Sequence, residues 1–357
     1  MHSWLGRPLL GGKDADEWKP SNWEEVASNI EQWYQAGRPL FPRESLQNIH
    51  DQLQKSPKNG DLIYVKGFDD VVYEYQVLTG NTRMLCDDAD DADDADDNSS
   101  QRQVHYVMGK PHIRYSAVSH MKSRLDWSRS RSYCGLSIGH WMTRADEAPE
   151  QTGVLAANLE FFESNYLSWE QSPAWKQIRT TLSSLKLPSK ITKIIGMACG
   201  SFSISSYQPK GCSRSAVQHN FLITVQKALR EHDLAAEDVE CYVQDPAYCE
   251  ADRRVLQTFG IQVVDDPEGF LLMDEGSLVF SCAPNICVKE IVADIVRPPV
   301  LIWCKVEEDN PEYSSTDPNS PRVLKMIETC YDDLPFPEDE NFTQMQIYTL
   351  KHTVASS

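Results

Sequence analysis

Three acidic residues within four positions offer the clearest acid–base chemistry in this sequence. Asp265, Asp266 and Glu268 follow a short apolar run, residues 261–264, that is typical of a strand. Carboxylates held close together shift one another's pKa, which separates an acid from a base, and they also clamp a guanidinium through two hydrogen bonds. The structural alternative is a turn held by aspartate side-chain hydrogen bonds and a proline. We treat the three acids as candidate catalytic residues.

A serine-rich turn, Cys199-Gly-Ser-Phe-Ser, follows an earlier apolar run at residues 191–198. Ser201 is a fourth candidate catalytic residue, as a nucleophile or hydroxyl contact, and Gly200 and Ser203 are candidate substrate contacts. The amides of this turn and of the helix expected after it favour an anion or an oxyanion, although serine-rich turns often only cap helices. A dinucleotide Gly-x-Gly-x-x-Gly, a P-loop and a Gly-x-Ser-x-Gly elbow are all absent from the sequence, so we expect no cofactor.

Two more polar turns follow apolar runs, at residues 245–248 and 281–285. Ligands of an open parallel sheet bind beyond the carboxyl ends of its strands. Asp245, Tyr248 and Asn285 are therefore candidate substrate contacts.

Residues 191–306 must position these turns, and they alternate short apolar runs with runs of helical period. That alternation is typical of βαβ units and a parallel sheet. We predict strands at 191–198, 239–245, 261–264, 278–282 and 300–304, and helices at 213–232, 250–259 and 288–296. Ser215 and Gln218 have the spacing of a capping box at the start of the first helix. On the second helix, Asp252 is expected to be exposed and paired with its neighbours Arg253 and Arg254.

The predicted fold class is α/β, a doubly wound, mostly parallel, five-stranded Rossmann-like sheet with an α+β N-terminal extension. The expected parts are an N-terminal region at 1–86, an acidic disordered loop at 87–100, a basic aromatic segment at 101–150, the α/β core at 151–306 and an acidic, proline-rich tail at 307–357. Within them we predict helices over 20–54 and 154–186, paired strands at 61–67 and 71–77, and one possible strand at 344–350.

Charge is spread unevenly over a chain whose formal net charge is −19. Residues 87–97 hold eight aspartates, whereas residues 101–144 carry eight lysines and arginines against one acid, interleaved with aromatics. Such a segment suits stacking on unpaired bases, but a half-buried subdomain with a basic rim fits equally. The candidate RNA-binding residues are Arg114, Lys122, Arg124, Arg129 and Arg131.

The remaining composition argues against membranes, metals and disulfides. An apolar run of the roughly 18 residues that a membrane span needs is missing, as is a secretory signal. The chain has ten cysteines but no Cys-x-x-Cys, so we expect no metal and a reducing, cytoplasmic setting.

With these residues placed, the chain resembles the sensitivity-to-red-light-reduced-like family in its filamentous-fungal form. The resemblance rests on the blocks Lys193-Ile-Ile-Gly-Met-Ala-Cys-Gly-Ser-Phe-Ser, Gln244-Asp-Pro-Ala-Tyr, 256–261, Val264-Asp-Asp-Pro-Glu-Gly-Phe, Pro284-Asn, 291–298 and 36–41. Some fungal relatives are similar to arginine-containing cyclodipeptide synthases, and other members look like regulatory proteins without assigned chemistry.

The synthase resemblance implies two partners, arginyl-tRNA and a second aminoacyl-tRNA, and neither a membrane nor DNA. The acids at 265–268 would then hold an arginyl side chain and act as acid and base, and the basic segment would meet tRNA. Bacterial cyclodipeptide synthases carry a nucleophilic serine two residues after a strand-end glycine. Counted from Gly196, that place is Ala198, so an acyl-enzyme needs Ser201 or Cys199, or the two bound esters react directly. The alternative function is a non-catalytic regulatory protein.

Overall fold

The structure is a computed structural model that describes residues 21–87, 102–123, 132–146, 153–309 and 315–351. The chain forms two compact units, which we describe separately. Unit 1 comprises residues 1–36, 47–116 and 120–149, and unit 2 comprises residues 37–46, 117–119 and 150–357.

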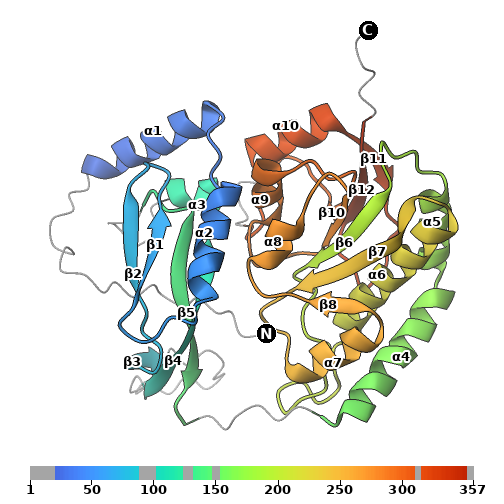
Figure 1. The fold of residues 1–357 in the computed structure, drawn as a ribbon, viewed down its shortest axis with the longest axis horizontal. Coiled ribbons are helices and arrows are strands. Elements are labelled where there is room, and N and C mark those ends of the chain that lie inside the picture. The colour runs from blue at the N-terminus through green and yellow to red at the C-terminus, as the bar shows by residue number, and fades with distance from the viewer. Residues whose placement is uncertain (1–20, 88–101, 124–131, 147–152, 310–314, 352–357) are drawn as a thin grey trace, which may run out of the picture. The chain divides into compact units, whose positions relative to one another are not determined.

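Unit 2 is built, in its described part, on a seven-stranded sheet in the order β11-β12-β10-β9-β6-β7-β8 (Figure 1). The strands are β6 (Ile191–Met197), β7 (Ala235–Gln244), β8 (Ile261–Val263), β9 (Ser277–Ser281), β10 (Val300–Cys304), β11 (Tyr331–Pro335) and β12 (Met345–Leu350). Strands β6 to β10 are parallel, and β12 runs antiparallel to both β10 and β11. Numbered along the chain, the parallel strands lie in the order 3-2-1-4-5. That order puts a topological switch point between β6 and β9, where ligands of such sheets bind.

Helices cover both faces of this sheet. They are α4 (Leu155–Gln171), α5 (Pro173–Ser183), α6 (Ser213–Glu231), α7 (Glu250–Thr258), α8 (Glu268–Leu272), α9 (Val288–Ile295) and α10 (Pro321–Cys330). In Figure 1, α4 to α7 lie to one side of the strands and α8 to α10 to the other. Alternate strand residues follow this division: Phe280 and Ile302 join the core under α4 to α6, whereas Val279 and Leu301 are buried outside that cluster.

The α/β class and all five predicted strands are confirmed. The segment expected to be a tail differs, because β12 forms as predicted but α10 and β11 were not foreseen. The acidic and proline-rich composition hides the apolar side of α10, where Val323 and Met326 are buried. Its start signal was present in the sequence: the hydroxyl of Ser320 accepts the amide hydrogen of Val323, and Pro321 opens the helix.

The predicted capping box at Ser215 is wrong. Helix α6 begins at Ser213, its N-cap is Cys212, and no side chain caps it. Ser215 instead lies buried in the first turn, with its hydroxyl 3.3 Å from the sulfur of Cys212.

Unit 1 contains two small antiparallel sheets in its described residues, β1-β2 and β3-β4-β5. Its strands are β1 (Leu62–Lys66), β2 (Val72–Gln76), β3 (Thr82–Asp87), β4 (Arg102–Tyr115) and β5 (Leu136–Arg144). The helices α1 (Ser21–Gln35), α2 (Arg43–Leu53) and α3 (Val118–Lys122) complete the N-terminal part of the chain, and the first turn of α2 belongs to unit 2. The two predicted N-terminal helices and the β1-β2 pair are confirmed, whereas β4 and β5 were not predicted within the basic segment.

Candidate functional site

The turn after β6 bends sharply at the carboxyl edge of the sheet. Ala198 and Gly200 both adopt positive φ angles, 56° and 74°. A side chain at Gly200 would meet the hydroxyl of Ser215 at 2.8 Å from its Cβ, so glycine suits both the angle and the space. The turn is thereby directed back towards the ends of β7 and α7.

Asp252, on α7, holds this turn together and is completely buried. Its carboxylate accepts hydrogen bonds from the hydroxyls of Ser201 and Ser203, each at 2.7 Å. It also accepts from the amides of Phe202 (3.2 Å), Ser203 (3.1 Å) and Cys249 (2.9 Å). A carboxylate offers about four lone-pair positions, so five donors occupy all of them.

The expectation that Asp252 is an exposed charge paired with its two arginine neighbours is wrong. Arg253 instead forms an ion pair with Asp265 at 2.7 Å, and Arg254 pairs with Glu250 at 3.2 Å. Successive residues on a helix do not face each other, which turns Asp252 inward while both arginines stay near the surface.

The backbone amides expected to cradle a substrate already have partners inside the protein. The amide of Gly200 donates to Asp245 at 2.8 Å, and those of Phe202 and Ser203 donate to Asp252. Burial raises the pKa of Asp245, and its hydrogen bonds from the Ala247 and Gly200 amides oppose that rise. The turn is therefore closed by the protein's own carboxylates in this conformation.

A buried relay of hydrogen bonds lies beneath the same turn. The Nδ1 atom of His219 is 2.6 Å from the carbonyl of Ser215, and its Nε2 atom is 2.7 Å from the hydroxyl of Tyr248. Because a carbonyl only accepts, Nδ1 carries the hydrogen, and the Tyr248 hydroxyl donates to Nε2. Burial lowers the pKa of His219 to about 4, so the ring is neutral. Burial also raises the pKa of the Cys199 thiol well above its usual range.

Tyr248 is thus a buried member of this relay, 8% exposed, and its hydroxyl serves His219. His219 was not predicted as part of this site, although the sequence carried a signal for it. A histidine within the apolar helix 213–232 needs partners for both ring nitrogens.

The three acids after β8 lie together but serve the turn in which they stand. Asp265 is exposed and bound to Arg253, and Asp266 accepts from the side-chain amide of Gln244 at 2.9 Å. Glu268 accepts the amide hydrogen of Asp265 at 3.3 Å. All three carboxylates lie at the carboxyl end of β8. This geometry is compatible both with a turn held by side-chain hydrogen bonds and with a catalytic role.

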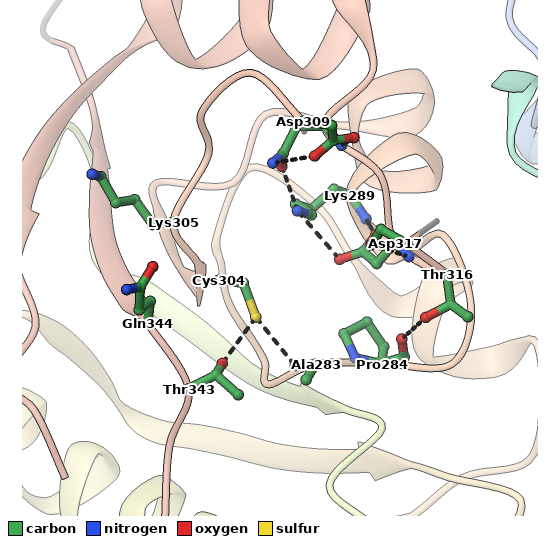
Figure 2. Close-up of a pocket in the computed structure, with 12 residues that line it drawn as sticks. Ala283, Pro284, Lys289, Cys304, Lys305, Asp309, Thr316, Asp317, Thr343 and Gln344 are labelled. Atoms are coloured by element: carbon green, nitrogen blue, oxygen red, sulfur yellow. Dashed lines mark hydrogen bonds and ion pairs between the residues drawn. The ribbon is translucent and has the colours of Figure 1, made fainter. Parts of the chain in front are cut away.

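A cavity of about 390 Å³ lies on the other side of the switch point, at the ends of β9 and β10 (Figure 2). Lys289 and Asp317, 3% and 7% exposed, form its inner wall. The Asp317 carboxylate accepts the Lys289 amide at 3.0 Å and lies 3.7 Å from its ammonium. Burial raises the pKa of Asp317 to about 6, against the opposing charge of Lys289. The nearby candidate Asn285 is exposed and is not among the residues that line the cavity.

Of the candidate RNA-binding residues, Arg114 and Lys122 belong to unit 1. Arg114 is exposed on β4, with its methylenes over Gly139, where a Cβ would come within 2.6 Å. Lys122 forms an ion pair with Glu31, which occupies much of its charge. Arg124, Arg129 and Arg131 lie outside the described residues.

Two structural features bear on ions and membranes. Among the residues that the structure describes, no group of three histidine, cysteine or acidic side chains is arranged to hold a metal ion. Over the same ranges, none of the helices has the length and apolar character to cross a membrane.

Comparison with known proteins gives a match to a family model and weak likenesses to solved structures. Residues 178–349 match the family model described as the SRR1 domain. A crystal structure of a SAM-dependent O-methyltransferase from Thermotoga maritima is similar at 9% identity, covering 84% of this chain and 96% of that chain with a TM-score of 0.27. A score that low carries no argument about activity. Among curated proteins, none matches the chain.

Proposed function

Starting from a chain that belongs to the SRR1 domain family over residues 178–349, we propose that it is an aminoacyl-transferring enzyme, specifically an arginine-containing cyclodipeptide synthase. Its substrates are arginyl-tRNA and a second aminoacyl-tRNA, and its product is an arginine-containing diketopiperazine made in secondary metabolism. The observation that carries the proposal is the polar carboxyl edge of the parallel sheet, which has two separate sides.

The two sides flank the turn after β6. On one side stand Asp245 and the acids at residues 265–268, at the ends of β7 and β8; on the other is the cavity at the ends of β9 and β10. Four strand spacings of about 4.8 Å separate β8 from β10, roughly 19 Å in all. One aminoacyl group is too short to fill both sides, whereas two groups meeting over β6 have one side each.

The reaction needs no activating nucleotide because both amino acids arrive as esters. The amine of one attacks the ester carbonyl of the other, forming an amide bond as the bond to the tRNA ribose oxygen breaks. The proton lost by the amine passes through a base to that leaving oxygen. A second attack, by the free amine of the dipeptidyl ester on its remaining ester, closes the ring and releases the second tRNA.

We assign the acid and base roles to Asp265, Asp266 and Glu268, since Asp252 is saturated by its five donors. Asp265 must release Arg253 before it can act, so Asp266 is the first residue to test. For the tRNA we propose the basic segment, with Arg114, Lys122, Arg124, Arg129 and Arg131 as contacts.

The second candidate function, a regulatory protein without catalysis, is favoured by the closed turn. The amides of Gly200, Phe202 and Ser203 all donate to internal carboxylates, as they would in a turn whose only task is structural.

Expression of the full chain in a bacterial host, followed by mass spectrometry for arginine-containing diketopiperazines, separates the two. The synthase predicts such a product, and loss of it in Asp265→Ala and Asp266→Ala. The matched control is Asp332→Ala, at an exposed position on β11, which should leave the product unchanged. Absence of product, together with no binding of arginyl-tRNA by the purified protein, would leave the regulatory function.

A further inference from the structure

The cavity at the ends of β9 and β10 combines an apolar floor with a charged rim. Figure 2 shows Ala283, Pro284, Cys304 and Thr343 along one side, and Asp309 with Lys289 across from them. A volume of about 390 Å³ falls in the range of small-molecule sites, roughly 300 to 1,000 Å³. The space suits one amino-acid side chain with its backbone.

The charged side chains around the cavity form ion pairs, with the exception of one carboxylate. Lys289 is matched by Asp317, both more than nine-tenths buried, and Lys305 pairs with Glu307 at 2.9 Å. Among the described residues, Asp309 has no ion-pair partner in this structure, although it lines the cavity. Because Lys305 is engaged by Glu307 from outside the lining, Asp309 is the lining carboxylate left to bind a cationic ligand.

The remaining carboxylate is held in a fixed orientation. Asp309 accepts hydrogen bonds from the backbone amide and the side-chain amide of Asn319, at 2.8 and 2.9 Å. The ammonium of buried Lys289 donates to the side-chain oxygen of Asn319, which fixes the direction of that amide. About two of the four lone-pair positions of Asp309 therefore remain for a ligand, on a side chain that is already oriented.

We propose that this cavity binds a guanidinium-bearing side chain through Asp309. A guanidinium presents two parallel N–H donors that match a carboxylate, and it is more weakly hydrated than an ammonium. Its aliphatic stem would lie against Pro284 and Cys304. The identity of the ligand as an arginyl group rests on the proposed function, and it places arginine on the β9–β10 side of the edge. The other acid considered for this role, Asp265, already binds Arg253 on an open surface, with 69% of its side chain exposed.

Isothermal titration calorimetry of the full-length protein with L-arginine methyl ester tests the site without tRNA. We expect binding by the wild type, at least tenfold weaker binding by Asp309→Asn, and an intermediate loss in Asp309→Glu, which keeps the charge. The matched control Asp332→Asn, at an exposed position on β11, should stay within twofold of the wild type, and Asp265→Asn tests the competing acid. L-Citrulline methyl ester, which has the same shape without the charge, should bind at least tenfold more weakly, and L-lysine methyl ester should fall between the two.

The outcomes separate this inference from the proposed function. If the ester binds in a way that depends on Asp309 but expression yields no diketopiperazine, the guanidinium site is supported and the proposed synthase activity is refuted. If a diketopiperazine forms but Asp309→Asn binds the ester like the wild type, the guanidinium site is refuted and the proposed synthase activity is supported. Absence of ester binding by the wild type, or loss of binding in Asp265→Asn alone, also overturns it. Far-UV circular dichroism of each variant ensures that lost binding is not lost folding, and Asp309 is exposed enough for both substitutions to fold.

Discussion

Replacement of Asp252 by alanine should destabilise unit 2 at the carboxyl edge of its sheet. The carboxylate is completely buried and binds three amides and two serine hydroxyls of two different segments. In Asp252→Ala the two hydroxyls can rotate to other acceptors, but the amides of Phe202 and Cys249 lose theirs, and the amide of Ser203 keeps only the hydroxyl of Ser201 at 3.3 Å. An orphaned donor costs about 1–3 kcal/mol when buried. Phe202 and Ser203 are buried and Cys249 is only half-buried, so we expect a loss on the order of 4 kcal/mol.

A loss of that size is a large share of a typical folding stability of about 5–15 kcal/mol. Urea denaturation followed by circular dichroism measures it, and hydrogen–deuterium exchange of a peptide covering residues 199–212 should show faster exchange before global unfolding. Asp238→Ala, at an exposed position on β7, is the matched control and should change stability by less than about 0.5 kcal/mol. A loss below about 1 kcal/mol in Asp252→Ala, or unchanged exchange in the turn, would refute the view that this carboxylate holds the turn.

Two further predictions concern buried polar groups of unit 2. Burial lowers the pKa of His219 to about 4 from an ordinary 6.5, so the unfolded chain takes up the proton first as the pH falls. His219 should therefore reduce stability progressively from pH 6.5 to pH 4, by on the order of 3 kcal/mol, and a ring that titrates near 6.5 by NMR would contradict this. Asp294 accepts the amides of Leu40 and Phe41 at 2.6 and 2.9 Å. Asp294→Ala should cost about 3–5 kcal/mol and speed proteolysis between residues 37 and 42; unchanged cleavage there would show that the segment is held by other contacts.

The parallel sheet could be predicted because its strands contain short apolar runs that alternate with segments of helical period. Where burial is one-sided or comes from distant contacts, prediction failed. Strand β11 begins Tyr331-Asp-Asp-Leu-Pro, a pattern that reads as a loop until pairing with β12 supplies its hydrogen bonds. The amides of residues 40 and 41 bind Asp294, more than 250 positions away in sequence, and so hold this segment in unit 2. A local sequence pattern cannot predict such a contact.

The candidate site shows the same limit in its chemistry. The residue types at the strand ends were predictable, since polar turns must end buried strands. Their partners were not, because Asp252 and Arg253 are adjacent in sequence yet face opposite directions on α7. The cavity wall also escaped prediction. Lys289 lies on α9 and Asp317 in the loop before α10, and each residue type is usually exposed, so the sequence alone does not indicate that the two form a buried pair.

The turn after β6 places a firm constraint on any acyl transfer at this edge. Ala198, which stands where the resemblance to bacterial cyclodipeptide synthases would put a nucleophilic serine, has a positive φ of 56° and carries no nucleophile. Cys199 is 2% exposed, and burial raises its thiol pKa, which keeps it protonated and unreactive. Ser201 donates its hydroxyl to Asp252, which already accepts four other hydrogen bonds. A covalent intermediate thus has no suitable residue on this turn. In the proposed reaction both esters must therefore be bound together before either amide bond forms. The two sides of the carboxyl edge offer one binding place for each ester.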